Sequence, residues 1–214
     1  MSRETTRIFA DKAALSQAAL DLFVTTAVSA VNQRGRFLVA LSGGSTPGQL
    51  YQLLADLPAN RQPPWRQTHI FWGDERLVPP DDDGSNYKQA HDLLLAHIPI
   101  PPQNIHRTPG EVEAATAVVA TTIALQNLAP TGRPWPRFDL MLQGLGSDGH
   151  TASLFPGPIS SAEQTQPVIA VEADYDGRPG QRVTFPPLVI NDARKIVFLV
   201  SGKKKAAALT AVRT

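Results

Sequence analysis

The stretch "RFLVALSGGSTPGQLYQLLADL" (residues 36–57) passes from a short apolar run through a glycine-rich turn into a segment with helical spacing. The apolar run, 36–42, is short and ends at glycine, so it predicts a buried strand. The following residues, 46–57, predict a helix with Thr46 as its cap and Pro47 in its first turn. This succession of strand, turn and helix indicates an α/β fold.

The same alternation continues along the chain. Further strands are expected at 68–74, 137–146, 166–172, 181–185 and 193–202, and further helices at 11–33, from about 85, at 111–128 and from 203 onward. Several of these strands are continuous apolar runs, which is typical of a parallel sheet covered on both faces. The sequence therefore predicts a three-layer α/β/α fold with a mostly parallel, Rossmann-like sheet. Its length of 214 residues favours one domain spanning 1–214.

Composition excludes several classes of protein. The 20 basic and 19 acidic residues give a net charge of +1, which does not support nucleic-acid binding. The chain has no cysteine, which excludes disulfides, thiolate catalysis and cysteine–zinc sites. No signal peptide is recognisable, and no apolar run approaches the ~18 residues that a membrane span needs. We therefore expect a cytoplasmic protein without a membrane partner, either a monomer or a weak homo-oligomer.

Four polar clusters begin where predicted strands end. They are "SGGSTPG" (42–48), "GDER" (73–76), "GLGSDGH" (144–150) and "SGKKK" (201–205). Ligands of open parallel sheets bind beyond the carboxyl ends of the strands. The four clusters are therefore expected to converge at one edge of the sheet, and this convergence is the main functional signal in the chain.

The glycines of 144–149 have the G-x-G-x-x-G spacing of a dinucleotide-binding fingerprint. That fingerprint needs a helix that opens at the third glycine. Here two prolines in "HTASLFPGPIS" (150–160) limit any helix to about two turns, so dinucleotide binding is disfavoured. The glycines are better explained as bringing backbone close to a ligand and placing Asp148 and His150 at the sheet edge. A plain glycine turn with a surface histidine is the alternative.

The motifs carry a family resemblance. "SGGSTP", "FWGDERLVP" followed by "SNY", "FDLMLQGLGSDGHTASLFPG" and "RVTF" followed by "FLVSGKKKA" occur in the order seen in 6-phosphogluconolactonases. The chain resembles this family from about residue 8 to its end. The resemblance implies hydrolysis of 6-phosphoglucono-1,5-lactone to 6-phosphogluconate, in the oxidative pentose phosphate pathway. Members of the family usually continue with a further strand and helix, so we expect a domain that is short at its C-terminus, at Thr214.

Lactone hydrolysis needs a water nucleophile, a base that takes its proton, and donors for the developing oxyanion. His150 suits the base because an unperturbed imidazole has a pKa of about 6.5, close to neutral pH. Asp148 would orient the imidazole or stabilise its charged form, and Gly149 would offer backbone to the substrate. A structural hydrogen bond between the two side chains is the alternative.

A phosphate site is expected at the start of the helix predicted for 46–57. Free amides and the helix dipole there attract anions, which favours substrate binding by Gly43, Gly44, Ser45 and Thr46. The segment lacks the lysine of a P-loop, so nucleoside triphosphates are disfavoured. The alternative is that Ser45 or Thr46 simply caps the helix, and capping and phosphate binding are compatible with one another.

The resemblance also assigns charged residues to the substrate. It implies that Asp74, Glu75 and Arg76 face the sugar, although a buried ion pair that holds the loop is an alternative for this turn. It further implies that Arg182 and Lys205 bind the 6-phosphate, the arginine as a bidentate fork and the lysine as a point charge.

No cofactor and no metal are expected. Asp148, His150 and Asp74 can be drawn as a ligand set, but a lactone carbonyl is reactive enough for a base and oxyanion donors to suffice. Two other functions remain open: a sugar-phosphate deaminase or isomerase on the same fold, and a non-catalytic sugar-phosphate sensor. "TASLFPG" (151–157) after the Asp-Gly-His turn favours the lactonase over the deaminase.

Overall fold

A parallel sheet of four strands, in the order β2-β1-β4-β7, forms the centre of the computed structural model, which describes residues 4–173, 177 and 179–212. The strands are β1 (Phe37–Leu41), β2 (Thr68–Trp72), β4 (Leu140–Gln143) and β7 (Ile196–Phe198). Phe37 is paired with Thr68, and Val39 with Leu140, and each of the three strand pairs is parallel. The predicted fold class, a mostly parallel α/β fold, is therefore confirmed.

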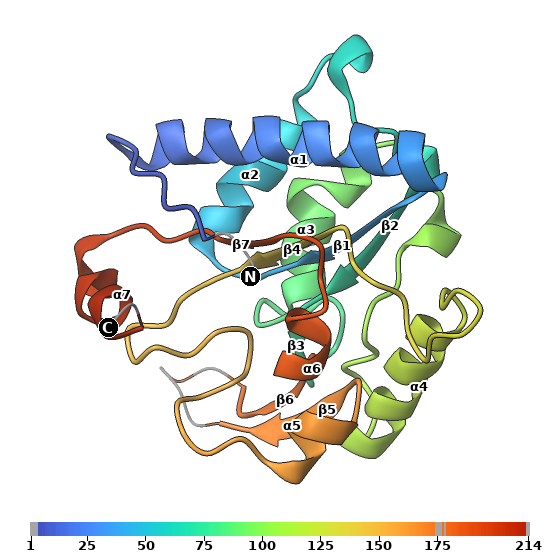
Figure 1. Ribbon diagram of the computed structural model, residues 1–214, viewed down its shortest axis with the longest axis vertical. Helices are drawn as coiled ribbons and strands as arrows, with labels where there is room; N and C mark the ends of the chain where they lie inside the picture. Colours follow the sequence, from blue (N-terminus) through green and yellow to red (C-terminus); the bar gives the residue numbers. More distant parts are fainter. Residues whose placement is uncertain (1–3, 174–176, 178, 213–214) are drawn as a thin grey trace.

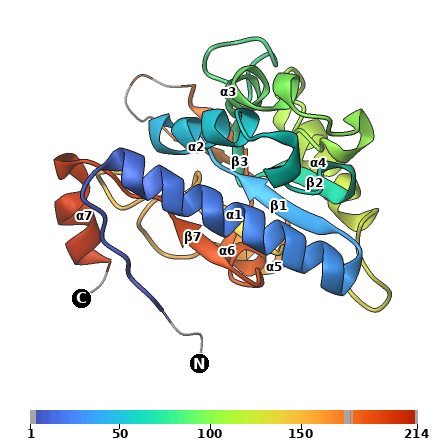
Figure 2. The same cartoon turned by 90° about the horizontal axis from the view of Figure 1, so that it is seen from above.

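Helices cover both faces of this sheet (Figures 1 and 2). On one face lie α1 (Lys12–Arg34), α2 (Ser45–Ala55) and α3 (Asn86–Leu93), and on the other lie α4 (Ala114–Gln126) and α6 (Pro187–Ile190). Successive residues of β1 enter different cores: Val39 packs with the α1–α2 side, and Leu38 packs with the α4–α6 side. Burial on both faces explains why this strand is apolar at every position.

A second sheet completes the α4–α6 side. Its strands, β3 (Asp74–Arg76), β6 (Gln181–Thr184) and β5 (Ile169–Glu172), pair antiparallel in the order β3-β6-β5. Val183 and Phe185 join the core beneath the parallel sheet. The strands expected at 166–172 and 181–185 thus form a sheet of their own, preceded by the short helix α5 (Ser161–Thr165).

Helix starts follow the predicted caps with one exception. The Asp11 carboxylate accepts the amide of Ala14 at 2.8 Å and begins α1 as expected. The prediction that Thr46 caps α2 is wrong, because the helix already begins at Ser45. The N-cap is Gly44, whose φ of 106° is one that residues with side chains rarely adopt, and no side chain caps this helix end.

The remaining elements are short. The 3₁₀ turns are η1 (Ala59–Arg61), η2 (Trp65–Gln67), η3 (Leu95–His97), η4 (Pro102–Asn104) and η5 (Lys203–Lys205), and η5 leads into α7 (Ala206–Ala211). The helix expected after residue 203 is therefore present. It lies at the side of the molecule, where Ala208 is buried and Leu209 is exposed (Figure 1).

Helix α1 has the length and apolar composition of a membrane span, with 23 residues and a mean hydropathy of 1.4 over its most apolar window. Its apolar residues are interrupted by serine, threonine and glutamine, so the helix contains no long uninterrupted apolar run. In this fold the helix packs on the sheet through Leu20, Phe23 and Ala27, so its apolar composition contributes to the core.

Candidate active site

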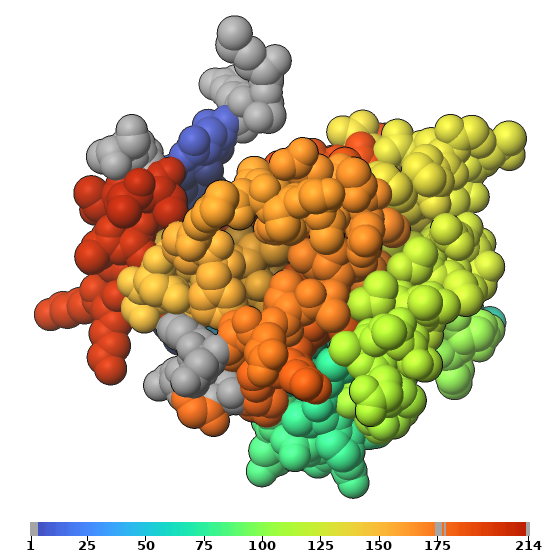
Figure 3. Space-filling model, turned by 90° about the horizontal axis from the view of Figure 1, so that it is seen from below, coloured from blue at the N-terminus to red at the C-terminus, as the bar shows by residue number. Residues whose placement is uncertain are grey.

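The four polar clusters follow β1, β2, β4 and β7, so the parallel sheet brings them to its carboxyl edge. Figure 3 shows one side of this region, where the segment after β4, coloured yellow to orange, lies between α7 and α4. Asn86 lies against both the first and the second cluster, and Ser153, just after the third, contacts the second. Lys205, in the fourth, is half-exposed on η5, where its backbone amide donates to the Gly202 carbonyl at 3.0 Å, and its side chain makes no hydrogen bond or ion pair in the part of the chain described.

Asp148 and His150 form the closest pair of reactive side chains at this edge. Oδ1 of Asp148 lies 2.7 Å from Nδ1 of His150 and also accepts the His150 backbone amide at 3.2 Å. Burial alone would raise the pKa of Asp148, but these hydrogen bonds outweigh it and hold the pKa below its usual value. An ionised Asp148 accepts a hydrogen bond from Nδ1–H, so the lone pair of the neutral ring sits on Nε2. The Phe155 ring lies 4.8 Å from the imidazole.

The glycines of the turn make room for this pair. A Cβ on Gly146 would overlap both Nδ1 of His150 and Oδ1 of Asp148, whereas a Cβ on Gly144 would meet nothing within 4 Å. Gly149 has a φ of 95°, and its amide donates to the carbonyl of Gly146 at 3.2 Å. The amide of Gly149 is thus engaged within the turn, and the G-x-G-x-x-G spacing serves the Asp-Gly-His turn.

Asp74 connects the second cluster to this turn. Its side chain is buried, and Oδ2 accepts the Ser153 hydroxyl at 2.7 Å. The Asn86 side-chain amide donates to the Asp74 carbonyl at 2.8 Å. Asp74 therefore fixes the loop after His150 against β3 and α3, and its carboxylate belongs to a buried polar network.

Glu75 holds the start of α3. Its carboxylate is 2% exposed and accepts the amides of Arg76 at 2.8 Å and of Asn86 and Tyr87 at 2.7 Å each. Burial raises the pKa of Glu75 to about 7, although the three amides oppose that shift. This geometry supports a structural role, with backbone amides as partners in place of the cation that the ion-pair alternative required.

Arg76 and Arg182 are direct register partners across β3 and β6. Arg76 donates to the carbonyl of Gly84 at 2.6 Å, and Arg182, 2% exposed, donates through Nε to the carbonyl of Pro179 at 3.0 Å. Two like charges placed opposite one another are unfavourable unless an anion joins them. The structure shows no contact between Arg182 and Lys205 among the residues it describes.

The first cluster wraps the start of α2. Gly44 is the N-cap, Ser45 and Thr46 are the first two helical residues, and no side-chain cap competes for their amides. A Cβ on Gly43 would overlap Oδ1 of Asn86. The Tyr51 hydroxyl donates to the Ser42 carbonyl at 2.6 Å and anchors the loop from within α2.

Buried donor atoms at this edge lack protein partners. Among the residues that the structure describes, the Ser42 hydroxyl, Nε of Arg76 and Nε2 of Gln143 are buried without a hydrogen bond. Such groups cost free energy unless a ligand or water meets them. They point to a polar ligand at the carboxyl edge of the sheet.

Sequence reasoning missed several residues of this network. Asn86 and Ser153 lie within "SNY" and "TASLFPG", but these motifs alone do not specify the contacts that the two side chains make. Gln143, whose Oε1 accepts the Thr151 hydroxyl at 3.1 Å, lies within "FDLMLQGLGSDGHTASLFPG", whereas Gln89, which contacts Gly44, lies outside the family motifs. Their roles depend on contacts that only the fold reveals.

No cluster of three or more His, Asp or Glu side chains is placed to hold a metal ion within 4–173, 177 and 179–212. Two shallow surface depressions lie along the outside of α1, one around Val24 and Val28 and the other around Gln17 and Lys195. Neither includes a residue of the four polar clusters.

A family model described as glucosamine-6-phosphate isomerases/6-phosphogluconolactonase matches residues 10–214. The chain belongs to this family. A protein named 6-phosphogluconolactonase from Nostoc sp. is 39% identical, over 98% of this chain and 85% of its own length. One of the same name from Mycobacterium leprae is also 39% identical, over 95% and 83%. The solved 6-phosphogluconolactonase of Trypanosoma brucei has a TM-score of 0.84 at 31% identity, over 98% of this chain and 86% of that chain.

Proposed function

We propose that this protein hydrolyses 6-phospho-D-glucono-1,5-lactone to 6-phospho-D-gluconate, with His150 as the general base. The single observation that carries the proposal is the 2.7 Å contact between Asp148 and His150 at the carboxyl edge of the parallel sheet. It is the arrangement that a general base needs, because the carboxylate orients the ring and stabilises its charged form. Relatives named 6-phosphogluconolactonase support the choice of substrate.

The proposed reaction has two steps. In the first, Nε2 of His150 takes a proton from water while the water oxygen attacks the lactone carbonyl carbon, which gives a tetrahedral oxyanion. In the second, the bond from that carbon to the ring oxygen breaks, and the imidazolium returns its proton to the departing oxygen. Asp148 remains ionised throughout and stabilises the imidazolium between the two steps.

The phosphate of the substrate is assigned to positive groups at the same edge. The uncapped start of α2 offers the amides of Ser45 and Thr46 together with the helix dipole. Arg76 and Arg182, register partners across β3 and β6, add two guanidinium groups. Lys205, half-exposed on η5, would join them by moving toward the bound phosphate.

The sheet edge is also compatible with deaminase or isomerase chemistry on a sugar phosphate, since the family model covers both activities. Those reactions move protons near C1 and C2 and use a carboxylate base. The only buried carboxylates near the turn that the structure describes, Asp74 and Glu75, are held by Ser153 and by the start of α3. This favours the lactonase, which we place in the cytoplasm, in the oxidative pentose phosphate pathway.

A coupled assay tests the proposal. The lactone is generated freshly from glucose 6-phosphate, and appearance of 6-phosphogluconate is followed with the spontaneous hydrolysis rate subtracted. A lactonase gives enzyme-dependent turnover, and the unphosphorylated lactone is a poor substrate. Turnover of glucosamine 6-phosphate with no lactone hydrolysis would establish the deaminase. Binding of 6-phosphogluconate without turnover of either substrate would establish a sensor.

A further inference from the structure

Helix α3 packs against the loop that begins α2. We call residues 43–46 the anion loop, because the proposed function assigns the substrate phosphate to them. Asn86 and Gln89, one helical turn apart on α3, contact the two consecutive glycines of this loop, Gly43 and Gly44. Neither α3 residue belongs to the charged or histidine-containing motifs from which the site was first identified.

Gln89 holds both backbone groups of Gly44. Its Oε1 accepts the Gly44 amide at 3.0 Å, and its Nε2 donates to the Gly44 carbonyl at 3.1 Å. The side-chain amide of Gln89 thus makes the same pair of hydrogen bonds to Gly44 that the backbone of a neighbouring strand would make. Because Gly44 is the N-cap of α2, this pairing fixes the point at which the helix begins.

The local sequence leaves room for this side chain. A Cβ on Gly48 would lie 3.2 Å from Nε2 of Gln89 and 3.3 Å from a methyl group of Leu93. Gly44 itself has a φ of 106°, and a Cβ there would meet nothing within 4 Å. The α2 backbone holds only the Gly44 carbonyl, through the Gly48 amide at 3.1 Å, so the Gln89 side chain from α3 is the described partner of the Gly44 amide.

We propose that Gln89 is a positioning residue that holds the anion loop in its phosphate-binding conformation, an inference that rests on the proposed function. A glycine-rich loop that is free in solution loses conformational entropy when it closes on an anion. Gln89 orders the loop beforehand, so that the amides of Ser45 and Thr46 already face the ligand. Its contribution is to affinity for the phosphate, while the chemical step at the lactone is unaffected.

The start of α3 is in turn fixed by Glu75, which accepts the amides of Asn86 and Tyr87. Glu75 thus connects to the anion loop through α3 and Gln89. This connection explains why the "GDER" motif contains a buried carboxylate, even if that carboxylate does not touch the substrate.

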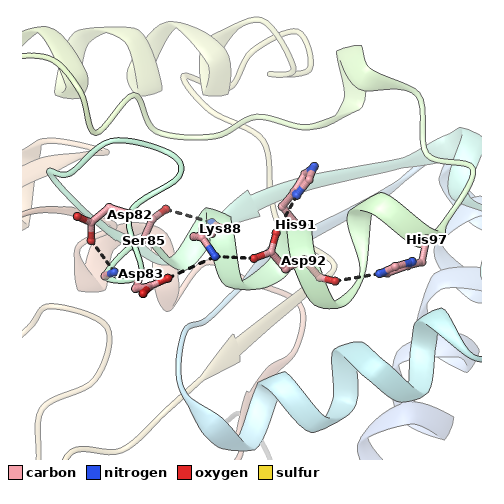
Figure 4. A network of polar contacts seen from close by, with 8 residues as sticks. Asp82, Asp83, Ser85, Lys88, His91, Asp92 and His97 are labelled. Atoms are coloured by element: carbon pink, nitrogen blue, oxygen red, sulfur yellow. Dashed lines mark hydrogen bonds and ion pairs between the residues drawn. The ribbon is translucent and has the colours of Figure 1, made fainter.

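The outward face of α3 provides a control. Figure 4 shows an exposed network in which Lys88 pairs with Asp92 at 2.7 Å and with Asp83 at 3.4 Å, and His91 contacts Asp92 at 3.1 Å. Lys88, His91 and Asp92 share the helix with Gln89, and no hydrogen bond or ion pair joins them to the anion loop in the part of the chain described. A substitution of His91 therefore perturbs α3 without touching Gly44.

Two substitutions of Gln89 test the inference, with His91→Gln as the control. Gln89→Met keeps the length of the side chain and loses both hydrogen bonds to Gly44. Gln89→Glu keeps an acceptor for the Gly44 amide, loses the donor and adds a negative charge beside the anion loop. For each variant we would measure the Tm, kcat and KM for the phosphorylated and unphosphorylated lactones, and the Kd of inorganic phosphate by calorimetry.

We expect Gln89→Met to raise KM for the phosphorylated lactone and the Kd of phosphate roughly 5- to 50-fold, as two neutral hydrogen bonds imply. Gln89→Glu should raise both further through repulsion. For both variants kcat and the KM for the unphosphorylated lactone should stay within about two-fold of wild type, as should every value for His91→Gln. Unchanged phosphate affinity in folded Gln89 variants, or equal losses on the two lactones, would overturn the inference. Phosphate binding is measured without turnover, so failure of the lactonase assay alone leaves this test intact.

Discussion

Arg76 and Arg182 stand opposite one another on antiparallel strands, as direct register partners of β3 and β6. If an anion joins them, Arg182→Ala should raise KM for the phosphorylated lactone roughly 10- to 150-fold, the range for a charge-assisted hydrogen bond of about 1.5–3 kcal/mol. The unphosphorylated lactone should be a poor substrate for both proteins, with similar kinetic constants for wild type and variant. Steady-state kinetics on both lactones decides this. Equal losses on the two would show that Arg182, which is buried, only supports the fold.

Gly146 is expected to be essential for the Asp148–His150 pair. A Cβ at this position would overlap both side chains, so Gly146→Ala should displace them and lower kcat at least 100-fold if general-base catalysis is lost. Gly144→Ala is the matched control, because a Cβ there meets nothing within 4 Å. Similar kcat values for the two alanine variants would mean that the pair does not depend on this packing.

Glu75 should make stability fall as pH rises. Its pKa in the folded protein, about 7, lies above the ordinary value of 4.5, so between these values the folded state holds a proton that the unfolded state has released. Unfolding free energy should therefore decrease across this window, by about 3 kcal/mol if the full shift applies. Glu75→Gln cannot ionise and should lack this slope in urea unfolding at several pH values. Parallel stability curves for the two proteins would contradict the raised pKa.

Asp139 is expected to matter for stability alone. It is 3% exposed, and its carboxylate accepts the Leu38 amide at 2.9 Å and pairs with Arg34 at 2.9 Å and Arg194 at 3.3 Å. Asp139→Asn keeps the shape but removes the charge from this network, and should destabilise the protein by about 2–4 kcal/mol. Chemical denaturation measures the loss. The variant should keep its kcat below the unfolding transition, since none of these contacts reaches His150.

The parallel sheet could be predicted because both faces of its central strands, β1 and β4, are buried, which leaves a local pattern: Leu38 and Val39 are both apolar yet belong to different cores. The separate β3-β6-β5 sheet could not be predicted from the sequence. Asp74 pairs with Thr184, and nothing local to either residue specifies a partner that distant in the chain. The prediction of Thr46 as the cap of α2 failed for a related reason. The N-cap is Gly44, whose backbone is held by Gln89 from another helix.

The same distinction applies to the site. Asp148 and His150 are two residues apart, so a local motif was enough to predict that they act together, and they lie 2.7 Å apart. Glu75 was predicted to face the sugar, but its partners are the amides of Asn86 and Tyr87, which depend on how α3 docks. Roles that rest on docking between elements are the ones that sequence reasoning did not recover.

The most direct test of the account is the turnover number of His150→Ala on freshly generated 6-phosphogluconolactone, compared with wild type. General-base catalysis typically contributes about 100- to 10,000-fold, so kcat should fall by that order while KM stays within a few-fold, because the phosphate-binding groups are intact. His150→Gln should do no better, since an amide cannot take the proton, and Asp148→Asn should lose less than His150→Ala. A folded His150→Ala variant with near-normal kcat would contradict the account and move the base elsewhere, first to Asp74.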